Sequence, residues 1–388
     1  MRCRPLLHAL PLLLAACAQS PQLVRWEAEF YATEHLYLDG GQTEAAARYA
    51  ELRHTATDPR DADDAALMAC ETPSRHGQFL QAAVCYDALA IDAETRATRA
   101  RALLHAAELR LDELGRTPDA VRMLETLVTR APEEAASARA VDVLVRYARR
   151  GPVQRDEMIQ RFRELEVAAP DSDLADNLLL RAAELMAETD RPRARESALA
   201  LLQRLQDRHG QDPTAMDALM LQARLQRALA RPRNETRTLE QVVATWETSL
   251  VFGTYTTTAH LDATRRLVEL YRYELKDLER AERHMRELPK MMMHATELPA
   301  LLVTLAEIQE ERGHLGDALS TYREVLSVVE ARRREEVAND RRICSEEPDP
   351  TARDRCFADI ATLTPIEPRE TAVARQAIAR LQHSEAPR

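Results

Sequence analysis

The sequence has few glycines and few aromatic residues. Among its 388 residues there are 9 glycines, and aromatic residues make up 4%. Runs of β-branched and aromatic residues are nearly absent, and the only β-like stretch is the short Thr/Tyr run at residues 254–258. Ala, Leu, Arg and Glu dominate, and 30% of the residues are charged. This composition argues against a sheet-rich fold and predicts an all-α protein whose helices have solvated faces.

Sequence motifs for catalysis and metal binding are also missing. There is no Gly-rich phosphate loop, Gly-x-Ser-x-Gly, His-Glu-x-x-His or Cys-x-x-Cys. Carboxylate pairs such as Glu310-Glu311 have arginine neighbours, which is typical of solvated ion pairs on helices. Residues 291–294 (Met-Met-Met-His) could suggest Cu(I), but they fit packing between helices better. We therefore expect no enzymatic activity, no cofactor and no metal site.

The clearest pattern in the sequence lies on the two sides of Gly115. Apolar residues recur there at helical spacing: Leu104, Ala107, Leu111, Ala120, Leu124 and Leu127. Gly115 suits a tight turn with positive φ, Thr117-Pro118 can begin a second helix, and Pro132 can end it. The stretch therefore predicts two antiparallel helices joined by a short turn.

This stretch resembles a tetratricopeptide repeat, a helix–turn–helix unit of about 34 residues. The same offsets recur after three further glycines, Gly40, Gly77 and Gly313, in three sets: Ala45, Tyr49 and Leu52; Ala82, Tyr86 and Leu89; Ala318, Tyr322 and Val325. Looser units fill the remainder and also fit related helical-hairpin families. The resemblance implies a right-handed α-solenoid of about eight hairpins over residues 17–330, followed by a C-terminal helical extension and cap over residues 331–388.

The N-terminus has the features of an export signal. Arg2 and Arg4 precede an apolar run, residues 6–14, that is too short to span a membrane. Leu14-Ala15-Ala16-Cys17 then resembles a bacterial lipobox. The resemblance implies that residues 1–16 are a lipoprotein signal peptide and that acyl chains are attached to Cys17. Because Ala18 is not the Asp that retains lipoproteins in the inner membrane, it also implies the periplasmic face of the outer membrane. An ordinary secretory peptide and surface exposure stay open.

Four other cysteines follow, an even number that favours disulfides in an oxidising compartment. Cys70 and Cys85 lie at similar distances before and after Gly77, so an antiparallel hairpin brings them to the same height. Cys344 and Cys356 flank a polar segment that can loop back. We expect the pairs Cys70–Cys85 and Cys344–Cys356; four buried free thiols are the alternative.

In tetratricopeptide proteins the first helix of each hairpin lines a concave groove that binds partners. The corresponding residues here are His105, Leu109, Asp112, Glu113, Arg266, Leu270, Tyr273, Glu307, Glu310 and Glu311. The resemblance implies a lipid-anchored scaffold that binds proteins or peptides in this groove and assists assembly of an envelope machine. The alternative is an accessory or regulatory subunit of a cell-wall enzyme. A net charge of −11 argues against nucleic acid as the partner.

Overall fold

The computed structural model describes residues 21–248, 254–291, 297–362 and 368–384. Regular structure in these ranges is helical throughout, and they contain no strand. The Thr/Tyr run at 254–258 is the first turn of a helix. The predicted signal peptide, Cys17, and Met292, Met293 and His294 lie outside the described residues. None of the described helices is both long enough and apolar enough to cross a membrane.

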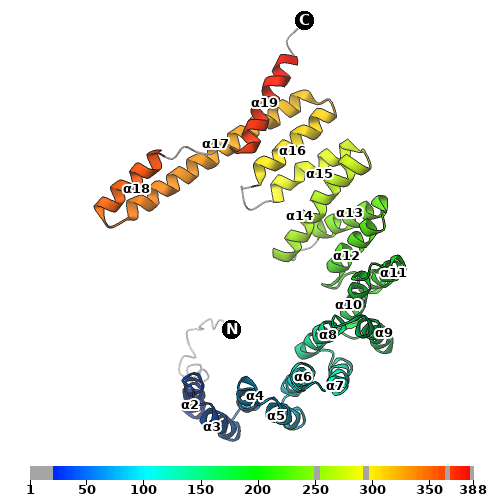
Figure 1. Ribbon diagram of the computed structural model, residues 1–388, viewed down its shortest axis with the longest axis vertical. Coiled ribbons are helices and arrows are strands. Elements are labelled where there is room, and N and C mark those ends of the chain that lie inside the picture. The colour runs from blue at the N-terminus through cyan, green and yellow to red at the C-terminus, as the bar shows by residue number, and fades with distance from the viewer. Residues whose placement is uncertain (1–20, 249–253, 292–296, 363–367, 385–388) are drawn as a thin grey trace, which may run out of the picture. The chain divides into compact units, whose positions relative to one another are not determined.

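The first of two compact units ends at His209 and consists of five helical hairpins. Its helices are α2 (Pro21–Leu38), α3 (Gln42–Thr55), α4 (Pro59–Arg75), α5 (Phe79–Asp92), α6 (Arg96–Asp112), α7 (Thr117–Arg130), α8 (Ala135–Ala148), α9 (Pro152–Ala168), α10 (Ala175–Ala187) and α11 (Pro192–His209). Each helix packs against the next, and neighbouring hairpins stack. Within this unit the second helices α3, α5 and α7 lie along one side and the first helices α2, α4 and α6 along the other (Figure 1).

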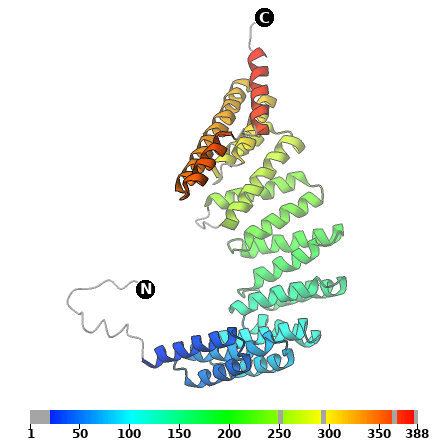
Figure 2. The ribbon, with the colours of Figure 1, turned by 60° about the vertical axis from the view of Figure 1, so that its left-hand side comes forward.

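The second unit begins at Gly210 and contains three more hairpins. Its elements are α12 (Ala215–Ala228), α13 (Pro232–Thr248), α14 (Thr254–Glu269), the π-helical turn η2 (Leu270–Glu274), α15 (Leu278–Met291), α16 (Leu298–Glu311), α17 (Leu315–Glu346), α18 (Pro350–Thr362) and α19 (Arg369–Ser384). Helix α17 extends well beyond its hairpin, and α18 folds back along this extension (Figure 2). Helix α19 packs against α16 and α17 as a cap.

The predicted all-α repeat architecture is therefore confirmed, with eight hairpins in the described residues. The hairpin anchors are core residues: Tyr49 is fully buried, and Tyr86 and Tyr322 are nearly so. The small Ala107 and Ala120 are also fully buried, where the two helices of the third hairpin approach each other. The right-handed superhelix stays a prediction.

Six hairpins turn through a residue with positive φ, placed two positions before the second helix begins. Four of these residues are glycines, as the repeat pattern predicts. The sixth and seventh hairpins instead use Ala230 (φ 54°) and Lys276 (φ 55°). A positive φ strains the backbone of any residue that has a Cβ atom. The absence of glycine at these two turns explains why the repeat pattern is weak there.

Two disulfides link neighbouring helices, with the pairing that the sequence predicted. Cys70 and Cys85 join α4 to α5, with their Cα atoms 5.4 Å apart. Cys344 and Cys356 join the end of α17 to α18, with their Cα atoms 5.6 Å apart. Each disulfide joins two helices that follow one another in the chain, so each closes a short loop.

Candidate functional site

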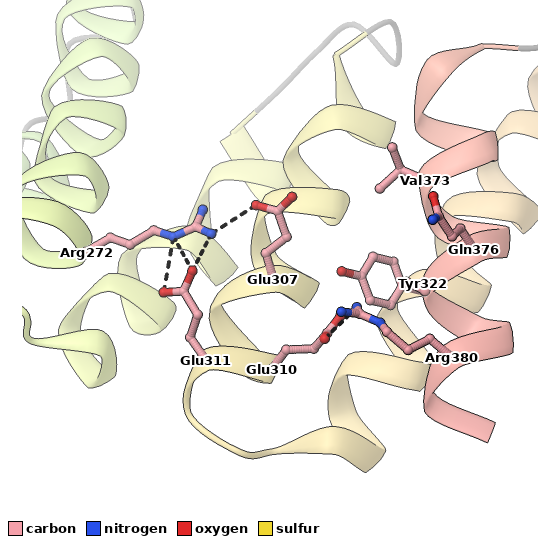
Figure 3. A pocket seen from close by; sticks show the side chains of 9 residues that line it. Arg272, Glu307, Glu310, Glu311, Tyr322, Val373, Gln376 and Arg380 are labelled. Atoms are coloured by element: carbon pink, nitrogen blue, oxygen red, sulfur yellow. Dashed lines mark hydrogen bonds and ion pairs between the residues drawn. The ribbon is translucent and has the colours of Figure 1, made fainter. Parts of the chain in front are cut away.

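The second unit contains a cavity of about 560 Å³ where α16 faces η2 on one side and α19 on the other (Figure 3). We call this cavity the groove pocket. The residues that line it are Arg272, Glu307, Glu310, Glu311, Tyr322, Val373, Gln376, Ala377 and Arg380. The glutamates come from α16, Tyr322 from α17, and the last four residues from α19. Three glutamates that the sequence placed in a binding groove therefore lie in one cavity.

The glutamates reach the pocket because their spacing keeps them on one side of α16. Glu307 and Glu311 are separated by one helical turn, and Glu310 lies between them. The opposite side of the helix carries Leu302, Leu305 and Ile308, which are buried in the core. Burial of this apolar side thus fixes the direction in which the carboxylates point.

Arg272 joins the seventh hairpin to the eighth at one end of the pocket. Its Nε donates to Glu311 Oε1 at 3.1 Å, and a terminal nitrogen donates to Glu307 Oε2 at 3.0 Å (Figure 3). The guanidinium also lies 5.0 Å from the centroid of the Tyr273 ring. Burial disfavours the charged form of Arg272, but its hydrogen bonds to Glu311 and Glu307 prevail and raise its pKa. Arg272 therefore holds the carboxylates of Glu307 and Glu311 in fixed positions.

Arg380 closes the other end of the pocket from the cap helix. One terminal nitrogen lies 2.8 and 2.7 Å from the two oxygens of Glu310. Burial, and then a hydrogen bond to Glu310, raise the pKa of Tyr322 above its ordinary value. Tyr322 consequently stays neutral and keeps its proton at physiological pH. Glu310 thus links α16, α17 and α19.

The arrangement suits recognition better than catalysis. Its three carboxylates and two guanidinium groups leave one negative charge in excess. Each carboxylate is already paired with an arginine, so none is poised as a general base. Among the described lining residues there is no His, Ser or Cys that could act as a nucleophile or proton shuttle. The pocket can offer fixed charges and hydrogen-bonding groups to a polar ligand.

The residues predicted from the seventh hairpin have different environments. Leu270 is fully buried in the core beside Leu267 and Tyr271, so its assignment to the groove surface is wrong. The π-helical turn adds a residue to this helix end and rotates Leu270 inward. Arg266 is bound to Glu235, Glu269 and Glu274, which leaves it little freedom to contact a partner. Tyr273 is exposed.

The residues predicted from the third hairpin belong to the first unit. His105 Nδ1 lies 3.5 Å from Glu108, and its ring lies 5.1 Å from that of Tyr86. Asp112 accepts a hydrogen bond from Arg150 of the next hairpin. Leu109 is half-buried, and Glu113 is exposed at the end of α6. Their role in partner binding stays a prediction.

Sequence reasoning missed four polar residues of the groove pocket. Tyr322 was recognised as a core anchor only, and Gln376 and Arg380 lie on a cap helix whose packing the repeat pattern does not specify. Arg272 could have been found, because it takes the place of the buried Leu111 of the third hairpin. A charged residue at a core position of a repeat is a usable signal.

A second cluster of ionisable groups lies where α15 meets the beginning of α17. Atoms of Glu282, His314 and Asp317 that could bind a metal lie within 4.8 Å of one another. Glu282 is nearly buried and accepts hydrogen bonds from Arg286 and Arg312. Two guanidinium groups on the central carboxylate oppose cation binding, so this cluster is an ion-pair network.

Comparison with known proteins identifies one of the hairpins. Residues 101–133, which span most of the third hairpin, match the tetratricopeptide repeat family. No curated protein shows a significant match.

Several solved structures are similar to parts of the chain. The C-terminal part of a repeat-containing protein from Cytophaga hutchinsonii is 10% identical, with a TM-score of 0.40, covering 68% of this chain and 95% of that one. A tetratricopeptide repeat protein from Parabacteroides merdae is 15% identical, with a TM-score of 0.31, covering 74% and 97%. A structure of Naa15/Naa10 bound to HypK-THB is 17% identical, with a TM-score of 0.39, covering 96% of this chain and 54% of that one.

Proposed function

We propose that this chain, whose third hairpin is a tetratricopeptide repeat, is a scaffold without catalytic activity that binds a protein or peptide partner in the groove pocket. The observation that carries the proposal is the pocket itself, in which three carboxylates, two guanidinium groups and a buried tyrosine line one cavity. Stacked helical hairpins offer extended surfaces of this kind for partner binding.

The groups of the pocket are held in place before any partner arrives. Arg272 restrains Glu307 and Glu311, and Arg380 restrains Glu310. Restrained side chains lose little conformational entropy on binding, which favours affinity. The exposed Gln376 can pair with a peptide backbone group, since its amide both donates and accepts. The excess negative charge favours a partner segment with a basic residue.

We place the scaffold at the periplasmic face of the outer membrane, anchored by acyl chains on Cys17, where it would assist assembly of an envelope machine. The motif Leu14-Ala15-Ala16-Cys17 behind its apolar run supports the anchor. The two disulfides support an oxidising compartment, because such bonds are rare in a reducing cytosol. More than one acyl chain is needed for a stable anchor, and a lipobox cysteine carries at least two.

Site-specific crosslinking tests the pocket. A photo-reactive amino acid replaces Gln376 in the full chain, and the matched control carries it at Gln382, another exposed glutamine on α19 that points away from the pocket. Purification from the native envelope should give a specific adduct from position 376 and not from 382. Equal adducts from both positions, or a partner that co-purifies without any adduct at 376, would contradict the assignment. If the captured partner is a cell-wall enzyme, the chain is its accessory subunit.

Cell fractionation tests the anchor separately. We expect Cys17→Ser to release the chain from the membrane fraction and to change its electrophoretic mobility. A variant that stays membrane-bound with unchanged mobility would refute lipidation, and it would leave the pocket assignment intact.

A further inference from the structure

The solvent side of α5 is apolar, unlike that of the neighbouring second helices. Leu80, Val84 and Ile91 are 55%, 60% and 77% exposed, and Ala88 is exposed between them. These four residues follow one face of the helix, and we call them the α5 stripe. In α7, which has the same length of 14 residues, the position of Val84 holds Arg122. The stripe is therefore a local departure from the repeat and not a property of all second helices.

The ends of α5 also differ in charge from those of its neighbours. Helices α3 and α7 have an acidic residue in the first turn and basic residues in the last turn, which suits the helix dipole. Helix α5 has neither, and it ends with the exposed Asp92 at the negative end of its own dipole. Its N-cap residue Gln78 makes no side-chain capping bond. Neither end of α5 thus carries a complementary charge within its own helix, and at the C-terminal end Arg53 of α3 and Arg99 of α6 donate to the backbone oxygens of Asp92 and Ala93.

A hollow of about 610 Å³ lies beside the N-terminal end of the stripe. Phe79, Leu80 and Val84 form one wall, and Leu114 from the turn between α6 and α7 forms another. The most exposed apolar side chain of the stripe, Ile91, lies at the opposite end of the same helix. One end of the stripe therefore offers a hollow and the other end offers a side chain that projects from the surface.

We propose that the α5 stripe is a two-fold interface between two copies of this chain, with their α5 helices antiparallel. Antiparallel packing about the middle of the stripe places Val84 opposite Ala88 of the second copy, a large residue against a small one. It also brings Ile91 of each copy to Gln81 and the hollow of the other. Each hollow receives the same side chain, as a two-fold interface requires.

The same arrangement also places Asp92 favourably. Asp92 of each copy approaches the N-terminus of the other copy's α5, where the free backbone N–H groups and the positive dipole end favour a carboxylate. A parallel arrangement would bring the two Asp92 side chains together and leave both hollows empty. A bilayer surface is disfavoured as the occupant, because helices that lie on membranes are rich in Lys and Arg and α5 contains neither.

Sedimentation equilibrium of the full chain, over a concentration series, tests the interface. The wild-type chain should reach twice its monomer mass at high concentration. Val84→Arg, which copies the residue of α7, should raise the dimer dissociation constant about tenfold or more, because the two-fold axis introduces the charge twice. Val153→Arg is the control, since Val153 is a similarly exposed apolar residue on α9. Circular dichroism verifies that both variants fold.

A second variant tests the antiparallel orientation. Asp92→Lys should weaken the dimer while leaving the monomer at least as stable, because Lys suits the C-terminal end of a helix. A chain that is monomeric at every concentration, or a Val84→Arg variant that dimerises like the wild type, would overturn the proposal. Binding of phosphatidylcholine vesicles through this face by a monomeric chain would also overturn it and assign the stripe to lipid.

Discussion

Arg272 and Leu111 occupy the same place in their hairpins: each lies four residues before the residue with positive φ, Lys276 in one case and Gly115 in the other. Both side chains are buried, Arg272 at 7% and Leu111 at 3% exposure. In the third hairpin the leucine only fills the core. In the seventh, the arginine passes through the same space and binds two glutamates at the groove pocket, so a core position has become part of a surface site.

This relationship predicts that Arg272→Leu weakens partner binding while leaving the free energy of unfolding nearly unchanged. Glu307 and Glu311 are each 42% exposed, so water can solvate them once the guanidinium is gone. We expect Arg272→Leu to change the free energy of unfolding by less than about 1 kcal/mol, and Arg272→Ala to cost about 2 kcal/mol by leaving a cavity. Crosslinking at position 376 should fall in both variants. A full crosslinking yield with Arg272→Leu would show that the ion pair has no part in binding.

The two strained turns offer a route to higher stability. Ala230 and Lys276 adopt positive φ although each has a Cβ atom, and this strains the backbone. Ala230→Gly and Lys276→Gly should therefore each stabilise their hairpin by about 0.5 kcal/mol. The reverse change, Gly115→Ala, should destabilise the third hairpin by about 1 kcal/mol through strain alone, since an added Cβ there meets no atom within 4 Å. Hydrogen exchange, read hairpin by hairpin, checks the three variants. The change in exchange should be confined to the substituted hairpin and the hairpins beside it, because each repeat interacts mainly with its neighbours.

The sequence predicted about eight hairpins, four of them from a clear pattern and the others from looser ones, because apolar residues recur at helical spacing around the turns. The helical extension and cap predicted over residues 331–388 contain the observed cap helix α19, Arg369–Ser384. The Cys70–Cys85 pair followed from the similar distances of the two residues to Gly77, and the Cys344–Cys356 pair followed from the polar segment that they flank. Regular local spacing is sufficient for such features, since every contact involved is between helices adjacent in the chain.

The groove pocket was only partly predictable, because some of its contacts join residues that are far apart in the sequence. Arg380 binds Glu310 across 70 residues of sequence, and no local pattern links them. Leu270 was misplaced because the π-helical turn inserts one residue and rotates the helix end, which periodicity cannot reveal. The α5 stripe was visible in the sequence, but it becomes meaningful only when α5 is compared with α3 and α7 at matched positions.

Glu282 should make the second unit sensitive to acid. Burial alone would raise its pKa, but hydrogen bonds from Arg312 and Arg286 lower it below the usual 4.5. A lowered folded-state pKa contributes stability above the unfolded-state value, and this contribution is lost as the pH falls through the folded-state pKa. Glu282→Gln should therefore be less stable than the wild type at pH 7 and should lose less further stability on acidification. Glu324→Gln, which removes an exposed carboxylate of α17, is the control. Parallel stability profiles for wild type and Glu282→Gln from neutral pH into acid would contradict this.

Tyr49 should govern part of the stability of the first unit in alkali. Burial, and then the charges of Glu34 and Glu71, raise its pKa to about 12 from the usual 10.0. The folded state holds the phenolic proton more tightly than the unfolded state does. The contribution of Tyr49 to the free energy of unfolding is therefore complete below pH 10 and is lost as the pH rises toward 12. Its hydroxyl is buried and has no hydrogen-bond partner among the described residues, so Tyr49→Phe removes a group that gains nothing from burial.

We expect Tyr49→Phe to be as stable as the wild type at pH 7, or more stable by up to about 1 kcal/mol, and to lose less stability between pH 10 and 12. Part of the alkaline loss should persist, because burial also raises the pKa of Tyr86. Tyr31→Phe is the matched control, since Tyr31 is 61% exposed on α2. Urea unfolding at a series of pH values measures all three proteins. If Tyr49→Phe loses as much stability in alkali as Tyr31→Phe does, the Tyr49 hydroxyl is not the group that titrates.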